Sequence, residues 1–229
     1  METFGIENLR HLLLDLYLSN TRRVRDFGDG TCGVEYYDVG TDTWIAEKKP
    51  QTIQLSPALA VIPGVDDGYV PHCTNTLVMG GAGQNYPYRQ LQFDPDVEQA
   101  SWWQFALPPN FDPTQDIKLS VFWKAESVIV GDVVWGVSVL GREECQAWDA
   151  ALETEVEVVD TTHGTILSVV KTEITLTPAD HELAANDAVI LQLARKATDD
   201  CDTLTEDADV VMCKLDIAIN PAVLIEGMP

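Results

Sequence analysis

The chain has 229 residues, and its 37 acidic against 14 basic residues give a formal net charge of −23. A negative charge of this size opposes attraction to nucleic-acid phosphates and to anionic membranes, so we expect neither as a partner. The hydrophobic content of 45% is sufficient for a core. The length fits one large β domain, or a domain of about 140 residues with an appendage.

Residues 1–20 are predicted to contain an N-terminal helix. Isoleucine and leucine recur at spacings of three and four between residues 3 and 18, and further leucines widen the apolar surface beyond one stripe. Such a helix must pack on its own domain or on a neighbouring chain. Arginines follow the predicted helix, and residues 1–25 carry almost none of the chain's net negative charge. The candidate interface residues here are Leu12, Leu14, Leu18, Arg22, Arg23 and Arg25.

Glycines and prolines divide residues 21–86 into pieces too short for a regular fold. Valine, isoleucine and aromatic residues are nevertheless too frequent for simple disorder. We expect an extended arm with short strands, which lies along a surface or adds edge strands to its own sandwich or to a partner. The domain boundary is predicted near Tyr86.

Beyond this boundary, apolar and polar residues alternate with a period of two, which places one face of each strand in a core and the other in solvent. The eight runs span residues 89–93, 103–107, 117–124, 133–139, 156–158, 166–176, 189–195 and 211–219. Eight short strands without intervening helices predict a mainly β fold, in which residues 87–229 form an eight-stranded antiparallel sandwich of jelly-roll type. Strand count alone leaves the connectivity open.

The six tryptophans divide into two groups. Trp103, Trp123 and Trp135 have core parity in their strands, so we expect them to be buried. The other three fall off this pattern and are candidates for a protein interface or for stacking on a sugar, with the interface favoured. These three are Trp44, Trp102 and Trp148.

An acidic loop precedes the last strand. Its carboxylates are Asp199, Asp200, Asp202, Glu206, Asp207 and Asp209. Hard oxygen ligands gathered on one loop could hold Ca²⁺, but the spacing is not that of an EF-hand and the glycine of such a loop is missing. A solvated turn is therefore favoured, and we expect no cofactor apart from this weak calcium candidate.

We recognise no catalytic arrangement of residues in the sequence, so we expect a protein that is not an enzyme. Glu143 and Glu144 near Trp148 could serve as paired carboxylates, and His72-Cys73 could be a nucleophile pair, but neither has a positioned partner. The five cysteines are an odd number without a C-x-x-C pair, which predicts reduced thiols and no structural zinc.

Two stretches carry a resemblance to a known group of proteins. Residues 102–112 form a strand ending in Leu-Pro and an aromatic-Asp-Pro turn, and residues 117–123 form a strand ending in Trp. Together with residues 186–209, this pattern resembles β-sandwich virion proteins of tailed bacteriophages, of the capsid decoration or cement type. The resemblance implies a trimeric protein of the virion, made in the host cytoplasm, whose partners are the major capsid protein or other virion proteins. It assigns no role to any single residue.

These features support two main hypotheses. In the first, the chain is a non-enzymatic virion structural protein that binds and stabilises the shell, with residues 1–86 as its anchor. In the alternative, it is a phage tail or fibre component whose sandwich binds glycans through the three tryptophans that lie off the core pattern. A hydrolase that uses Glu143 or Glu144 ranks third.

Overall fold

The computed structural model describes residues 22–26, 32–38, 43–46, 50–62, 73–79, 85–152 and 154–220. The chain divides into two compact units, Met1–Lys49 with Ile219–Pro229, and Pro50–Ala218. In the first unit, β1 (Arg22–Asp26), β2 (Cys32–Asp38) and β3 (Thr43–Ala46) form an antiparallel sheet in that order. Among the described residues, no helix is long and apolar enough to cross a membrane.

The predicted N-terminal helix, with Leu12, Leu14 and Leu18, lies outside the described residues. Arg22, Arg23 and Arg25 all lie on β1, where they pair with β2.

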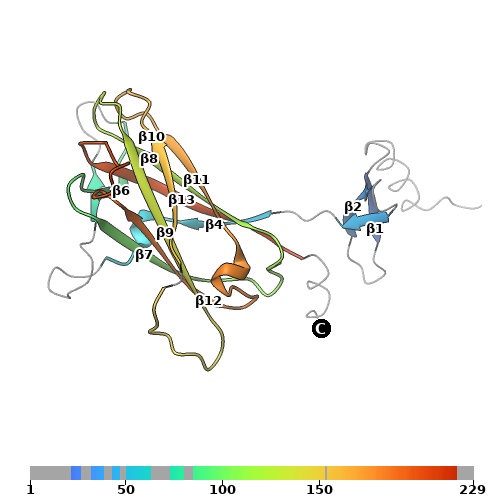
Figure 1. The fold of residues 1–229 in the computed structure, drawn as a ribbon. Coiled ribbons are helices and arrows are strands. Elements are labelled where there is room, and N and C mark those ends of the chain that lie inside the picture. Colours follow the sequence, from blue (N-terminus) through green and yellow to red (C-terminus); the bar gives the residue numbers. More distant parts are fainter. Residues whose placement is uncertain are drawn as a thin grey trace, which may run out of the picture. The chain divides into compact units, whose positions relative to one another are not determined.

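The second unit is a sandwich of two antiparallel sheets (Figure 1). The four-strand sheet has the order β10 (Val156–Thr161), β9 (Asp132–Arg142), β12 (Ala188–Arg195), β7 (Gln99–Ala106). The six-strand sheet has the order β11 (Val170–Leu176), β8 (Ile117–Lys124), β13 (Ala208–Ala218), β6 (Tyr88–Phe93), β5 (Thr74–Val78), and β4 (Pro50–Leu55) also pairs with β13. Two short 3₁₀ helices complete the unit, η1 (Pro57–Leu59) and η2 (Pro178–His181).

The strand order is consistent with a jelly roll. From β6 to β13, each connection leads from one sheet to the other except the one between β9 and β10, which are neighbours in the same sheet. The eight runs predicted from alternation correspond to these eight strands. The prediction of a mainly β, antiparallel sandwich is therefore confirmed, and the strand order supplies the connectivity that strand count leaves open.

The sandwich begins earlier than the predicted boundary, which falls inside the second unit. Within the segment predicted to be an arm, β4 pairs with the second half of β13, from Leu55 opposite Cys213 to Pro50 opposite Ala218. Strand β5 pairs with β6 and forms the edge of the six-strand sheet. Both strands extend the sandwich itself, which is one of the outcomes expected for this segment.

Three tryptophans lie at the centre of the core. Trp103, Trp123 and Trp135 are fully buried, as predicted. The ring of Trp135 makes edge contacts with Phe93 at 5.2 Å and with Trp123 at 5.9 Å, and both partners come from the opposite sheet. Burying each of these side chains stabilises the fold by roughly 2–3 kcal/mol, and each edge contact adds about 1 kcal/mol.

Two details of the predicted strands are wrong. Alternation predicts that Val211 points into the core, but the pairing of β13 with β8 shifts register between Val210 and Met212, and it is Val210 that is fully buried. A β-bulge inserts one residue and so reverses the parity of the residues after it. Alternation also predicts Ile166 in a strand, but β11 begins at Val170 and Ile166 is exposed.

A buried arginine closes the loop between β12 and β13. The Arg195 side chain is fully buried, and its Nη2 and Nε atoms donate to the two carboxylate oxygens of Asp202 at 2.8 and 3.0 Å. Its remaining donors bind the backbone carbonyls of Phe93, Leu204 and Glu206. All five N–H groups of the guanidinium are thus used. Arg195 ties the loop to β6 as well as to β12.

We expect Arg195→Ala to lower the free energy of unfolding by about 3–5 kcal/mol, because it leaves Asp202 buried without its partner. Urea denaturation monitored by tryptophan fluorescence measures this difference. Lys171→Ala is the matched control, since Lys171 pairs with Glu173 on the exposed face of β11, and it should leave the midpoint nearly unchanged. Equal effects of the two substitutions would contradict the role assigned to Arg195.

Candidate ligand-binding cleft

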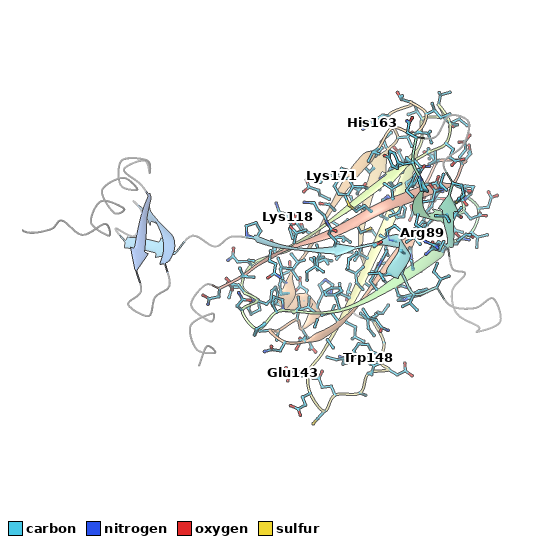
Figure 2. The ribbon with its side chains drawn as sticks, turned by 180° about the vertical axis from the view of Figure 1, so that it is seen from behind. Arg89, Lys118, Glu143, Trp148, His163 and Lys171 are labelled. Atoms are coloured by element: carbon cyan, nitrogen blue, oxygen red, sulfur yellow. The ribbon has the colours of Figure 1, made fainter. Side chains whose placement is uncertain are left out.

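The three tryptophans predicted to lie at an interface come from different elements of the structure. Trp148 is 44% exposed in the loop that joins β9 to β10, while Trp102 is half-buried in the middle of β7. The backbone of Trp102 pairs with Val61, so the segment after η1 covers part of that edge strand. Trp44 lies on β3, in the other unit. Figure 2 shows Trp148 and Glu143 at one end of the sandwich and His163 at the opposite end.

The residues considered for catalysis are poorly placed for it. Glu143 and Glu144 are exposed in the same loop as Trp148. Cys73 is fully buried, and burial raises the pKa of its thiol to about 12, against the smaller effect of a hydrogen bond with Ser101. A thiol with this pKa stays protonated near neutral pH and is a poor nucleophile. His72 lies outside the described residues.

The acidic loop does not gather its carboxylates into a cation site. Asp202 binds Arg195, Asp209 binds Lys124 at 2.7 Å, and Asp199 accepts the backbone N–H of Cys201 at 2.8 Å. Within the part of the chain that the structure describes, no group of three or more His, Cys, Asp or Glu side chains is placed to hold a metal ion. The weak calcium candidate at this loop therefore has no ligand cluster there, because the two most buried carboxylates are neutralised by protein cations.

An open cleft of about 450 Å³ lies on the six-strand sheet. Its floor and walls come from β6, β8, the bulge of β13 and the loop before β11. The lining residues are Asn85, Tyr86, Tyr88, Lys124, Leu167, Val169, Val211 and Met212. Both the volume and the composition, mainly apolar and aromatic with a few polar groups, are typical of sites that bind small molecules.

Two tyrosines form one side of this cleft. Their rings lie 6.1 Å apart and are tilted by 58°. Tyr86 is 68% exposed, and Tyr88 is half-buried with the Lys124 Nζ atom 6.0 Å from its ring centre. An aromatic ring left this exposed keeps its apolar face available for a ligand.

A buried ion pair holds the single charged lining residue. The Lys124 side chain is 4% exposed, and its Nζ atom lies 2.7 Å from Asp209 and 3.4 Å from Glu126. Burial lowers the pKa of Lys124, but the hydrogen bond and charge of Asp209 outweigh this, so the pKa is raised. Burial raises the pKa of Asp209 to about 6, although Lys124 opposes the shift. Among the described residues, the second oxygen of Asp209, Oδ1, finds no hydrogen-bond partner.

The wall opposite the tyrosines contains a strained residue. Leu167 has φ of 59°, in the left-handed region that leucine rarely adopts. Its backbone N–H donates to the carbonyl of Ala125 at 3.1 Å, and its side chain is 44% exposed. Such a conformation costs about 1–2 kcal/mol and persists only where the surrounding structure imposes it. The loop therefore holds this apolar side chain at the mouth of the cleft.

Sequence reasoning did not identify Tyr86, Tyr88 or Lys124 as site residues. The tyrosines flank Pro87 at the predicted domain boundary, and Lys124 occupies the polar row of a predicted strand. The partner of Lys124 is 85 positions away, so the pair leaves no local pattern. One available signal is the pair of tyrosines around Pro87. They precede the predicted strand 89–93 and fall on the opposite parity to its core residues Leu91 and Phe93.

Comparisons with known proteins give only distant similarities. No family model matches the chain, and no curated protein matches it. Among solved structures, a family 35 carbohydrate-binding module from Clostridium thermocellum covers 72% of this chain and 97% of its own, with 8% identity and a TM-score of 0.43. The CBM22-1 xylan-binding domain of Paenibacillus barcinonensis Xyn10C covers 76% and 99%, with 11% identity and a TM-score of 0.41.

An exo-β-1,3-galactanase from Phanerochaete chrysosporium covers 84% of this chain and 35% of its own length, with 12% identity and a TM-score of 0.35. None of these three structures is a virion protein. Because all three TM-scores lie below 0.5, we base the function of this chain on its own side chains.

The buried carboxyl of Asp209 should make stability depend on pH. Its pKa is about 6 in the folded protein and 3.8 in an unfolded chain, so the folded state binds this proton more tightly. The resulting stabilisation is complete below the unfolded pKa and is lost as pH rises through the folded pKa. Between roughly pH 3 and pH 7, the free energy of unfolding of the natural protein should fall by about 3 kcal/mol relative to that of Asp209→Asn.

Urea denaturation of both proteins at several pH values measures this difference. Asp200→Asn, in the exposed loop before β13, reports the effect of removing one negative charge. A difference between natural protein and Asp209→Asn that does not change with pH would show that burial does not control Asp209.

Proposed function

We propose that the sandwich is a non-catalytic carbohydrate-binding module whose glycan lies in the cleft between Tyr86, Tyr88 and Lys124. The observation that carries this proposal is the cleft itself: a space of about 450 Å³ lined by an exposed tyrosine, a half-buried tyrosine and one ion-paired lysine. A sugar ring presents an apolar face that suits an aromatic ring and hydroxyls that suit fixed polar groups. The alternative hypothesis from the sequence is thereby retained, but with tyrosines in place of the three tryptophans.

The electrostatics of the cleft favour a neutral glycan over an acidic one. Lys124 is the only charged residue among those that line the cleft, and its charge is matched by Asp209 and by Glu126. An anionic sugar would meet no uncompensated cation there, and the chain as a whole is strongly negative. Lys124 can still donate a hydrogen bond to a neutral hydroxyl, because an ammonium group has three donors.

The same lining residues support binding without turnover. They include no carboxylate, so the pair of acids that most glycosidases place around the scissile bond is missing from this cleft.

Substitution of the tyrosines tests the proposal. Tyr86→Ala and Tyr88→Ala should each weaken binding of neutral gluco-, galacto- or manno-oligosaccharides by about tenfold or more, since each removes an aromatic contact. Tyr88→Phe keeps the ring and should retain most of the affinity. Isothermal titration measures the affinities, and circular dichroism checks the fold.

Trp148→Ala is the matched control, because it removes an exposed aromatic residue from the β9–β10 loop, which contributes no residue to the lining of the cleft. Loss of binding in this variant, with no loss in the tyrosine variants, would move the site to the β9–β10 loop. Tighter binding of the corresponding uronic-acid oligosaccharides would contradict the preference for neutral sugars.

A second candidate function, assembly into a virion, is favoured by an exposed aliphatic patch. It consists of Val128, Ile129, Val130, Ile166, Leu167 and Val169. The two loops that carry it are joined, because the Thr162 hydroxyl donates to the carbonyl of Ile129 at 2.9 Å. Contiguous apolar surface of this kind is typical of protein-binding sites. A trimer, a capsid-protein partner and a location in the virion remain predictions from the resemblance to phage virion proteins.

The double substitution Val128→Asp with Val130→Asp tests the assembly function without altering the residues that line the cleft. If the patch mediates trimerisation or shell binding, light scattering should show a monomer, and the variant should no longer co-sediment with shells of the capsid protein. Ala147→Asp adds charge to an exposed loop at the other end and should change neither result. A variant that still forms trimers and binds shells would exclude the patch as the assembly surface.

A further inference from the structure

A seam between the two sheets is closed at one end and open at the other. Strands β10 and β11 lie at corresponding edges of opposite sheets and contact each other (Figure 1). At the closed end, the Thr172 hydroxyl donates to Asp160 at 2.8 Å and accepts the indole N–H of Trp123 at 2.8 Å. The open end lies where β10 begins and β11 ends.

This open end forms a groove of about 480 Å³, separate from the tyrosine cleft. Its lining residues are Thr154, Val156, Thr175, Thr177, Asp180 and His181. Three of the six carry hydroxyls, which can both donate and accept hydrogen bonds. The lining contains neither lysine nor arginine, so an anionic ligand would find no permanent cation to bind.

The groove includes a buried imidazole with unused hydrogen-bonding capacity. His181 is 2% exposed, and within the described part of the chain its Nδ1 atom has no partner. It ends η2, and the next residue, Glu182, has φ of 49° in the left-handed region. A buried polar atom without a partner is energetically unfavourable, and so is a left-handed backbone at a residue other than glycine. His181 thus forms part of the buried wall of the groove.

We propose that this groove is a second carbohydrate site, which binds a neutral, hydroxyl-rich sugar and makes the module bivalent. The choice of ligand class rests on the function proposed for the tyrosine cleft. The groove contributes the polar groups that a sugar needs, with threonine hydroxyls beside the ends of both strands and the Asp180 carboxylate as an acceptor. Because the lining residues include no tryptophan, tyrosine or phenylalanine and the imidazole of His181 is buried, the groove binds its sugar mainly through hydrogen bonds.

Two sites on one rigid sandwich would give avidity for a polymer. A glycan chain or a glycan-coated surface that engages both sites binds more tightly than either site alone, because the second contact forms at a high effective concentration. A free monosaccharide would occupy the sites independently and more weakly.

Threonine-to-valine substitutions test the groove with little risk to the fold. Thr175 and Thr177 are exposed, and valine keeps the β-branched shape while removing the hydroxyl. The full chain, labelled with ¹⁵N, is titrated with glucose, galactose, mannose and their neutral oligosaccharides. The expected result is two sets of shifts, one around Tyr86 and Tyr88 and one around His181. The double valine variant should weaken the second set about tenfold and leave the first unchanged.

Lys171→Ala, which changes an exposed residue on β11 outside the groove, is the control and should preserve both sets. Tyr86→Ala separates the two proposals. Residual binding in Tyr86→Ala that disappears when the valines are added supports two sites. Complete loss of binding in Tyr86→Ala alone overturns the proposal that the groove binds a sugar and supports the cleft as the binding site. Binding that is undiminished in Tyr86→Ala and in Tyr88→Ala but is lost with the valines supports the groove and overturns the cleft. No shift with any of these sugars overturns both.

Discussion

The hydrogen bonds of the Arg195 guanidinium are the interactions on which the end of the sandwich that carries the cleft depends. It sits at the end of β12 and binds both oxygens of Asp202 and the carbonyls of Leu204 and Glu206, so the loop that leads into β13 has one available path. That path sets the first residues of β13 beside β6 and β8. Asp209 is thereby brought against Lys124, and the bulge after it places Val211 and Met212 in the cleft.

Buried charge is handled differently at the two cations. Arg195 meets a complete set of acceptors, so the cost of removing it from water is offset by five hydrogen bonds. Lys124 meets a carboxylate that, among the described residues, keeps one oxygen without a partner. The guanidinium of Arg195 has no unused donor. The pair of Lys124 and Asp209 keeps one unused acceptor oxygen, and Lys124 lines the open cleft. This contrast favours the cleft as the place of the molecule's chemistry and leaves the acidic loop with a structural role.

The sequence predicts the framework well and the sites poorly. Alternation with a period of two is a property of the strand itself, so the eight strands and the burial of Trp103, Trp123 and Trp135 are recognisable without a structure. The prediction from alternation that Val211 points into the core is wrong, because the β-bulge between Val210 and Met212 cannot be recognised from the amino-acid composition. The acidic loop is a weak calcium candidate in the sequence because the cations that neutralise it, Arg195 and Lys124, come from other strands. The cleft is assembled from segments far apart in the sequence. The groove is formed by the ends of two successive strands with η2. Neither meeting is reported by a local pattern.

The pairing of Pro50 with Ala218 has a consequence for how this sandwich can be exchanged between proteins. The chain enters the unit at the start of β4 and leaves it at the end of β13, and these two positions are partners in one antiparallel ladder. A host chain that is opened at a single surface turn could therefore accept the whole sandwich without moving its own backbone far. The unit has the form of an insertable cassette, so its surface and the chain that carries it are free to evolve separately.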